Sequence, residues 1–482
     1  MITTSLYFYD LETTGISPKR DRIMQFAGQR VSLNFEPIGE PDNILVRLSD
    51  DCLPSPEAVM VHGISVDDCL SKGVSEAELA EIINDKIAIP GTAIIGFNNI
   101  RFDDEFIRYL NFRNFYDPYG WQYKDGNSKW DCLDMIRMTR ALRPEGIKWA
   151  VDEEGKPTNR LEKMTAANGI DHVNAHDALS DVMATISICK LIQDAQPDLF
   201  SYLFRLRNKH EVKKVLSRRE PLVYTSSRYP SEVMHTAAVG VINFDPVKQT
   251  AVVFDLSKSP SEINGMTVDD IVQAWSYDPA KTKPALPFKT IKINHCPAIA
   301  SSAVLTDENY RTLKVSRDLV ERHFRELLEV KEELSAKLAK VAVKLDDEQQ
   351  NRVASKHEPA AEEKLYDGFI DNNDARLFPV AREGQDNVPF KDKRLIEIYG
   401  LYKARNYRSS CNEDEEAYWR SHVRECLELG LPNGRFDSYV AKLKEIIEDA
   451  NNKQYEPLMI ALLKRSEAIA NEYGKSLPAA AA

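Results

Sequence analysis

SLYFYDLETTG, residues 5–15, decides how the start of this chain folds. The run from Ser5 to Glu12 is apolar and aromatic and ends at the turn-forming TTG, which is typical of a buried β-strand. Alternate residues of a strand point to the same face, so Asp10 and Glu12 put two carboxylates side by side at its end. Such a pair either binds a hard divalent cation or forms a solvated strand edge with a capping acid, and this motif alone leaves both alternatives open.

Two further motifs carry acids or a histidine beside a predicted helix start. FNNIRFDDE, residues 97–105, puts Asp103 near a helix N-terminus, where a carboxylate also serves as an ordinary cap. NAHDALSD, residues 174–181, puts His176 in a loop and Asp181 on the helix that follows. Each of these two motifs alone favours a structural role, but the three motifs in this order make a specific pattern.

The first two hundred residues alternate between strand and helix patterns. Strands are predicted at residues 5–12, 22–33, 43–48 and 93–97. Helices are predicted, with breaks, over residues 55–88, and then over 103–112 and 176–193. This order predicts an α/β domain in which helices flank a mixed sheet.

The rest of the chain changes from short strands to helices. VGVINF (239–244), TAVVFDL (250–256) and TIKINH (290–295) predict a small β-barrel or sandwich, and residues 317–345 predict a long helix. The polar stretch 346–364 is the predicted linker, and a helix-rich segment follows it. We therefore predict three domains, over residues 1–200, 201–352 and 355–476.

Composition excludes several classes of protein. The chain has 482 residues, 43% of them apolar, which is enough to bury cores and excludes general disorder. No apolar run reaches membrane-spanning length, and the first residues predict no secretory signal. The seven cysteines are scattered without CxxC pairs, which predicts reduced thiols, a cytoplasmic location and no zinc ribbon.

Positive charge is concentrated in two runs, although the net charge is −12. FRLRNKHEVKKVLSRR (204–219) carries seven cations, and KDKRLIEIYGLYKARNYR (391–408) carries six together with three tyrosines. Local positive potential is enough to hold a phosphate chain. We expect these runs to line a nucleic-acid channel, with a solvated helix face as the alternative.

The three motifs together resemble the DEDDh exonucleases of the RNase H-like fold. Their acids and histidine correspond here to Asp10, Glu12, Asp103, His176 and Asp181. Further segments narrow the resemblance to the bacterial exonuclease I family, among them NFYDPYGWQY (114–123), ALRPEGIKW (141–149), RLEKMTAANGI (160–170) and YKARNY (402–407). The resemblance implies an α/β RNase H-like nuclease domain, then a small SH3-like β-barrel domain and a C-terminal α-helical domain. It also implies a monomeric, processive 3′-to-5′ exonuclease that degrades single-stranded DNA to mononucleotides in DNA repair and recombination.

The resemblance also implies roles for the acids and the histidine. Asp10, Glu12 and Asp181 would hold one Mg²⁺, and Asp10 and Asp103 would hold a second about 3.5–4 Å away, with Mn²⁺ able to substitute. His176 would act as general base on the attacking water. The family pattern gives no such role to the neighbouring Asp104 and Asp177.

Substrate and partner contacts follow from position and from the same resemblance. Glu12 and Thr13 adjoin the metal site and are expected to meet the terminal nucleotide. The remaining predicted strand contacts are Arg108, Tyr119, Tyr123, Arg137 and Arg160, with Arg160 the best candidate for a phosphate. Arg143 and Tyr202 are expected to bind the acidic C-terminal tail of the single-strand DNA-binding protein.

Two alternatives remain open from the sequence. One is a DEDDh nuclease acting on RNA, although such enzymes need only the first two hundred residues. The other is a strand-binding scaffold with a catalytically dead core, which the presence of all five motif residues disfavours.

Overall fold

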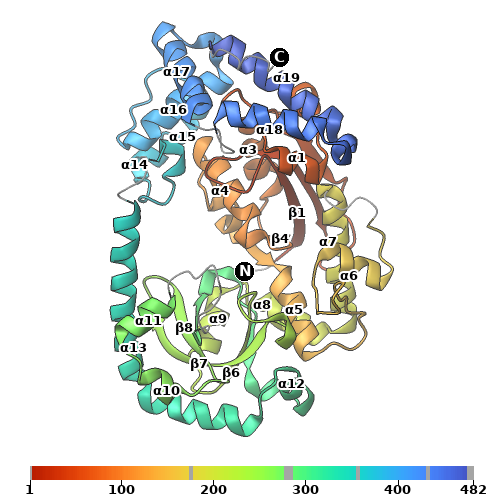
Figure 1. The fold of residues 1–482 in the computed structure, drawn as a ribbon, viewed down its shortest axis with the longest axis vertical. Helices are drawn as coiled ribbons and strands as arrows, with labels where there is room; N and C mark the ends of the chain where they lie inside the picture. Colours follow the sequence, from red (N-terminus) through yellow and green to blue (C-terminus); the bar gives the residue numbers. More distant parts are fainter. Residues whose placement is uncertain (1–2, 173–176, 276–285, 354–358, 430–434, 475–482) are drawn as a thin grey trace. The chain divides into compact units, whose positions relative to one another are not determined.

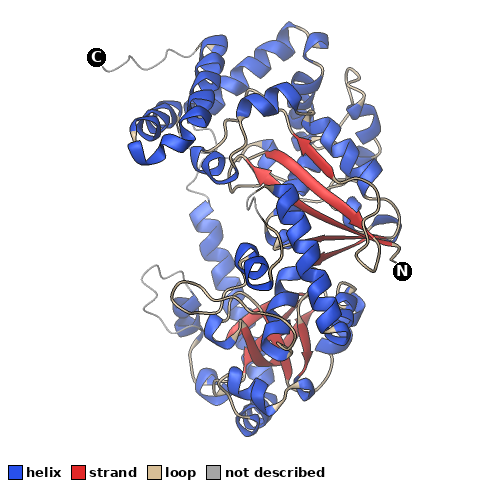
Figure 2. Cartoon of the chain, turned by 90° about the vertical axis from the view of Figure 1, so that its right-hand side faces the viewer, coloured by secondary structure: helices blue, strands red, loops and turns tan. Residues whose placement is uncertain are grey.

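The chain folds into two compact units. The computed structural model describes residues 3–172, 177–275, 286–353, 359–429 and 435–474. The first unit comprises Met1–Ser128, His172–Ile186 and Pro359–Ala482, and the second comprises Lys129–Asp171 and Ser187–Glu358. Strands occur in two sheets, and the described part of the chain after residue 359 is helical (Figure 2).

A mixed sheet organises the first unit, as the sequence predicts. The strand order of this sheet is β3-β2-β1-β4-β5. In the first unit lie β1 (Ser5–Thr13), β2 (Ile23–Val31), β3 (Asp42–Leu45) and β4 (Thr92–Gly96), and β5 (Ser128–Asp131) begins at the residue where this segment of the first unit ends. β1 pairs antiparallel with β2 and parallel with β4, so the strand that carries the first motif is central.

Helices cover this sheet, and their positions agree with the broken helical pattern of residues 55–88. They are α1 (Pro56–His62), α2 (Val66–Lys72), α3 (Glu76–Glu81) with the π-helix η1 (Ile82–Ile87), and α4 (Asp103–Arg113), and α7 (Ala178–Ala195) begins in this unit. Tyr7 and Tyr9 of β1 share one core with Phe106 and Leu110 of α4. None of the helices in the described residues is both long and apolar enough to cross a membrane.

The C-terminal helices belong to the first unit because they share its core. They are α14 (Asn372–Ala375), α15 (Phe378–Arg382), α16 (Lys393–Asn406), α17 (Glu413–Leu429), α18 (Phe436–Glu448) and α19 (Glu456–Tyr473) (Figure 1). Trp419 and Tyr439 lie in one apolar cluster with Met24 and Val59 from the start of the chain. Phe115, which follows α4, stacks on Phe390 with ring centroids 5.3 Å apart.

The second unit is built around an antiparallel sheet in the order β10-β6-β7-β8-β9. Its strands are β6 (Leu222–Thr225), β7 (Thr236–Asp245), β8 (Thr250–Asp255), β9 (Phe288–Lys292) and β10 (Ile299–Ser301). The predicted strands are present, while β6 and β10 are too short for a clear sequence pattern. The helices of this unit are α5 (Cys132–Leu142), α6 (Leu161–Asn168), α8 (Pro197–Arg205), α9 (Lys209–Leu216), α10 (Pro260–Asn264), α11 (Val268–Trp275), α12 (Asp307–Thr312) and α13 (Arg317–Val353).

The long helix α13 extends further than predicted. Leu327, Leu334 and Leu338 are buried, in agreement with the apolar positions of the pattern. The helix continues to Val353, so residues 346–353 of the predicted linker are helical. Glu and Gln have good intrinsic helix propensity, so a polar stretch can continue a helix without an apolar face. The polarity of residues 346–353 therefore suggests a linker, although these residues are helical.

A buried ion network joins the sheet and the C-terminal helices within the first unit. Glu362, which is 6% exposed, accepts hydrogen bonds from Arg22 at 3.0 Å and from Arg405 at 3.1 Å. Arg405 also pairs with the buried Asp51. Burial by itself would raise the pKa of Glu362, but Arg405 and Arg22 lower it to about 2. Glu362 therefore stabilises the fold as a carboxylate.

The Glu362→Gln variant tests this network. We expect it to lower the free energy of unfolding at pH 7 by about 3 kcal/mol, because two buried guanidinium groups lose their shared counterion. The loss should shrink as the pH falls from about 4.3 toward 2, where the parent carboxylate also becomes protonated. Urea unfolding of both proteins at several pH values measures the difference.

The neighbouring Glu363→Gln variant is the matched control. Glu363 pairs with Arg20, which is 53% exposed, at 3.1 Å. Surface pairs contribute less than about 1 kcal/mol, so this variant should differ little from the parent. Equal losses for the two variants would contradict the assigned role of the buried network.

Candidate active site

Three carboxylates meet at the end of β1. Oxygen atoms of Asp10, Glu12 and Asp181 lie within 4.8 Å of one another. Asp10 and Glu12 share a face of β1, where they pair with Ala27 and Gln25 of β2. The register shifts between Glu12 and Thr13, so the strand is irregular where its carboxylates leave the sheet. Asp181 comes from the first turn of α7.

The electrostatics of this trio favour a bound cation. Burial and the charges of Asp103, Asp181 and Asp177 raise the pKa of Asp10 well above its ordinary value. Burial, Asp10 and Asp181 raise the pKa of Glu12 to about 9. Three oxygen donors that repel one another fit a hard divalent cation, which would neutralise the repulsion. The donor set therefore fits the predicted metal group.

Asp103 and Asp104 separate into different roles at the start of α4. Asp103, the fourth predicted ligand, is 5% exposed and contributes to the raised pKa of Asp10, although it is not one of the three residues within 4.8 Å. Asp104 is fully buried and accepts hydrogen bonds from other side chains. The acid that the family pattern passes over is thus engaged inside the protein.

Histidine enters the site from an unpredicted position. His176, the predicted general base, lies outside the described residues. His172 is buried, and its Nε2 lies 2.5 Å from Oδ1 of Asp181. The sequence gives only a weak signal for this contact, because the two residues are nine positions apart and His172 lies before the helix.

Thr13 lies next to the carboxylates in a tightly bonded turn. Its hydroxyl donates to the carbonyl of Gly15 at 2.7 Å, and the side chain is buried. Gly15 is required here, since a Cβ atom would come within 2.6 Å of the Asp21 carboxylate. Asp21 in turn accepts from the Thr14 hydroxyl at 3.0 Å. The turn beside the site is therefore rigid.

An aromatic cavity of about 880 Å³ contains two of the predicted strand contacts. Tyr119 and Tyr123 line it, and Tyr123 is 56% exposed. Tyr366 and Phe369, which the sequence analysis missed, line the same cavity, and Phe369 is fully exposed. The only available signal was LYDGFI (365–370), an apolar, aromatic segment next to the predicted linker.

Arg108 lies beneath this cavity. Its guanidinium is 5.2 Å from the Tyr119 ring centroid and 3.4 Å from the Tyr366 hydroxyl. Glu105 pairs with the same guanidinium and accepts from the Tyr366 hydroxyl at 2.5 Å. Arg108 is buried, so it supports the aromatic wall from behind in this structure.

Four predicted residues lie in the second unit. Arg137 pairs with Asp134 at 2.7 Å, and Arg160 is exposed at the start of α6. Arg143 donates to the carbonyl of Val304 at 3.0 Å, and the Tyr202 hydroxyl donates to the carbonyl of Ile299 at 2.9 Å. The two predicted partner contacts therefore adjoin one segment of the second unit, residues 299–304.

The expectation that both basic runs line a channel is wrong for most of the second run. Lys403 is buried and pairs with Glu415 at 2.8 Å. Arg394 pairs with Asp392, and Tyr399 and Tyr402 are buried in an apolar cluster. These cations are neutralised by acids, some of them distant in sequence, and this run stabilises the fold.

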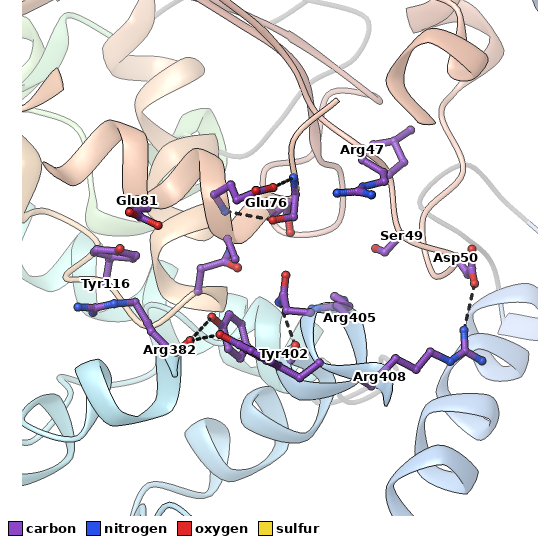
Figure 3. A pocket seen from close by; sticks show the side chains of 18 of the residues that line it. Arg47, Ser49, Asp50, Glu76, Glu81, Tyr116, Arg382, Tyr402, Arg405 and Arg408 are labelled. Atoms are coloured by element: carbon purple, nitrogen blue, oxygen red, sulfur yellow. Dashed lines mark hydrogen bonds and ion pairs between the residues drawn. The ribbon is translucent and has the colours of Figure 1, made fainter. Parts of the chain in front are cut away.

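A second cavity, of about 910 Å³, lies between α3 and the C-terminal helices (Figure 3). Figure 3 shows Glu81, Tyr116 and Arg382 together at one end and Asp50 at the other. Two of its arginines form ion pairs: Arg408 pairs with Glu416 at 2.9 Å, and Arg465 pairs with Asp50. Residues 402 and 404–408 of the second basic run line this cavity, but none of the predicted metal ligands or individually predicted strand contacts does, so the cavity does not belong to the carboxylate site.

Comparisons with known protein families divide the chain into three matches. Residues 7–189 match the family described as Exonuclease. Residues 207–343 match the Exonuclease I SH3-like domain, and residues 359–468 match the Exonuclease I C-terminal domain. The antiparallel sheet of the second unit is thus SH3-like, and the predicted fold class is confirmed.

Relatives and solved structures agree with these matches. The chain is 36% identical to exodeoxyribonuclease I of Haemophilus influenzae over 93% of this chain and 96% of that protein. It is 35% identical to exodeoxyribonuclease I of Escherichia coli over 97% and 98% of the two chains. The structure of E. coli exonuclease I in complex with a dA16 oligonucleotide superposes with a TM-score of 0.87 at 33% identity, covering 97% of this chain and all of that one. Exonuclease I of Methylocaldum szegediense gives the same TM-score and identity, over 97% and 99% of the two chains.

The Glu12→Gln variant tests the electrostatics of the trio. Folding raises the pKa of Glu12 from its ordinary 4.5 to about 9, so its ionisation destabilises the metal-free fold increasingly as the pH rises between these values. We expect the variant to be more stable than the parent at pH 8 without metal, by on the order of 1 kcal/mol, and the gain to vanish below pH 5. Differential scanning calorimetry in chelator measures it.

Divalent cation should reverse this order. Mg²⁺ is expected to stabilise the parent and not the variant, because the variant lacks one ligand. Glu36→Gln, at an exposed glutamate, is the control and should change neither result. A Glu12→Gln variant less stable than the parent in chelator at pH 8 would contradict the described repulsion.

Proposed function

The chain belongs to the exonuclease I family and is a 3′-to-5′ exodeoxyribonuclease, and from this premise we propose that it degrades single-stranded DNA processively to mononucleotides. The observation that carries the proposal is the carboxylate trio at the end of β1, with Asp103 close enough to raise the pKa of Asp10. Paired carboxylates of this kind are the protein ligands of metal-dependent phosphodiester hydrolysis. A scaffold with a dead core would have no need to hold three repelling acids together.

Two Mg²⁺ ions are the proposed cofactor, with Mn²⁺ as a substitute. Asp10, Glu12 and Asp181 would hold one cation, and Asp10 and Asp103 would hold the other. When bound, the cations acidify the attacking water and stabilise the departing 3′ oxygen. His176 is the proposed general base that accepts the proton of that water. His172, through Nε2, holds the Asp181 carboxylate in one orientation.

The aromatic cavity is the proposed path of the strand next to the site. α4 begins at Asp103, with Glu105 in the same first turn and Arg108 in the turn that follows. Exposed rings of Tyr123 and Phe369 offer faces for bases, and stacking on such rings does not depend on the base. The complex of E. coli exonuclease I with a dA16 oligonucleotide supports single-stranded DNA as the occupant.

Cations of the second unit are the proposed phosphate contacts. Arg160 is exposed, and the first basic run presents Lys214, Arg218 and Arg219 on its surface. Arg137 keeps its proposed role in contacting the strand. Binding through these groups should weaken as salt is added, because counterions compete for the phosphates.

Arg143 and Tyr202 are the proposed contacts for the acidic tail of the single-strand DNA-binding protein. Both donate hydrogen bonds to the segment 299–304, so both lie beside the same segment of the second unit. The guanidinium of Arg143 suits a carboxylate. We further propose that the protein acts as a monomer in the cytoplasm, in DNA repair and recombination.

Cleavage assays with the Asp10→Asn and Asp181→Asn variants test the proposed chemistry. Each substitution keeps the shape of the side chain and removes one ligand charge, so single-turnover cleavage should fall on the order of 10⁴-fold. Oligonucleotides labelled at the 5′ end, as single-stranded DNA, duplex DNA and RNA, give polarity and substrate class. Asp68→Asn, which breaks a surface pair with Lys72, is the control. Near-parental turnover in either ligand variant would refute the site.

The Phe369→Ala variant tests the proposed strand path. Loss of one stacking face should weaken strand binding by about 1–3 kcal/mol and reduce the nucleotides removed per encounter, with the cleavage step unchanged. Fluorescence anisotropy with a labelled oligonucleotide in Ca²⁺ measures affinity, and a competitor trap measures processivity.

Val247→Ala is the matched control, because Val247 is 89% exposed and does not line the aromatic cavity. The salt dependence of binding should be the same for Phe369→Ala and the parent, since Phe369 carries no charge. Equal affinity of Phe369→Ala and Val247→Ala would exclude the cavity as a strand path.

A further inference from the structure

Asp104 is a fully buried carboxylate directly beside a proposed metal ligand. A single oxygen, Oδ1, accepts three hydrogen bonds. The Tyr9 hydroxyl donates at 2.6 Å, the Gln122 amide at 2.6 Å and the Asn99 amide at 3.1 Å. Asp104 is therefore committed to the interior of the protein and is not free to bind a cation.

The donors come from three segments that surround the site. Tyr9 directly precedes Asp10 on β1, and Asn99 lies in the short 3-10 helix η2 (Asn99–Arg101) before α4. Gln122 ends the 3-10 helix η3 (Gly120–Gln122), directly before the exposed Tyr123 of the aromatic cavity. One carboxylate thus connects the strand with the first ligand, the helix with the fourth ligand, and the loop of the strand path.

The geometry of β1 and α4 lets these hydrogen bonds limit the positions of the proposed metal ligands Asp10 and Asp103. Successive residues of a strand point to opposite faces, so Tyr9 points away from the face that carries Asp10. The Tyr9–Asp104 hydrogen bond joins β1 to the start of α4 from behind, one residue away from Asp10 on one side and from Asp103 on the other. Its length consequently limits how far Asp10 and Asp103 can separate.

Tyr9 is itself fixed by packing. Its ring lies 6.0 Å from the Phe26 ring in a stacked arrangement and 5.6 Å from the Trp121 ring in an edge-on arrangement. Because Tyr9 is held rigidly on a rigid strand, its hydrogen bond fixes the position of Asp104 relative to β1.

We propose that Tyr9, Asp104 and Gln122 are positioning residues that set the separation between Asp10 and Asp103 and so tune the affinity of the cation shared by these two ligands. The proposal rests on the proposed function. Hydrogen-bonded partners behind metal ligands typically change metal affinity by about 10- to 100-fold when they are removed.

β1 provides a matched control for a merely structural hydrogen bond. Tyr7, two residues before Tyr9, also stacks on Phe26 and donates to an aspartate, Asp42, at 2.6 Å. Tyr7 and Tyr9 are both 2% exposed. Tyr7→Phe and Tyr9→Phe therefore each remove one tyrosine hydroxyl from β1, but only Tyr9→Phe breaks a hydrogen bond to α4.

Calorimetric titration of the full chain with Mn²⁺ alone, after treatment with chelator and without DNA, separates the two cases. Tyr9→Phe should weaken the weaker of the Mn²⁺ binding steps about tenfold, while Tyr7→Phe should bind Mn²⁺ as the parent does. Melting temperatures in chelator should fall by similar amounts for both variants. Gln122→Leu, which removes a second donor to Asp104 without changing β1, should also weaken Mn²⁺ binding.

Equal Mn²⁺ affinities of Tyr9→Phe and Tyr7→Phe would overturn the positioning role, whether both match the parent or both are weakened. If Tyr9→Phe does not fold, parental Mn²⁺ affinity in Gln122→Leu would overturn it. The proposed function fails separately, if the parent chain binds Mn²⁺ but does not cleave single-stranded DNA.

Discussion

Repulsion between carboxylates is the constraint on which the rest of the structure depends. Asp10, Glu12 and Asp181 hold their oxygens within 4.8 Å, and burial raises the pKa values of Asp10 and Glu12. Without a cation such an arrangement is unfavourable, so it persists only because the surrounding structure determines it. Three features hold the carboxylates in place. They are the pairing of β1 on both sides, the rigid turn after Glu12 and the first turn of α7.

The proposed metal site and the proposed strand path share one helix, α4, in the first unit. α4 starts with Asp103, and the same helix supports the aromatic cavity through Glu105 and Arg108. Asp104 links the same helix to β1 and to the loop before Tyr123. A shift of α4 would therefore move Asp103, a proposed ligand, together with a wall of the proposed strand path.

The sequence predicts those parts of the site that depend on local geometry. The shared face of Asp10 and Glu12 follows from strand periodicity, and the position of Asp103 follows from the helix start at residue 103. Contacts between distant segments escaped prediction: Phe369 in the cavity of Tyr123, and Lys403 paired with Glu415 instead of facing a channel. The sequence cannot distinguish a buried, paired cation from an exposed one, because the two differ in partner acids that only the fold brings close. The helical extension of α13 escaped for a related reason, since polar helix formers read as a linker.

The shared core of the first unit has a consequence for synthesis on the ribosome. Met24 and Val59 are translated long before Trp419 and Tyr439, which cover them. Domains generally fold as units when their whole sequence has emerged, and this unit closes on segments from both ends of the chain. A polypeptide that stops before α17 would leave the apolar surface around Met24 and Val59 uncovered.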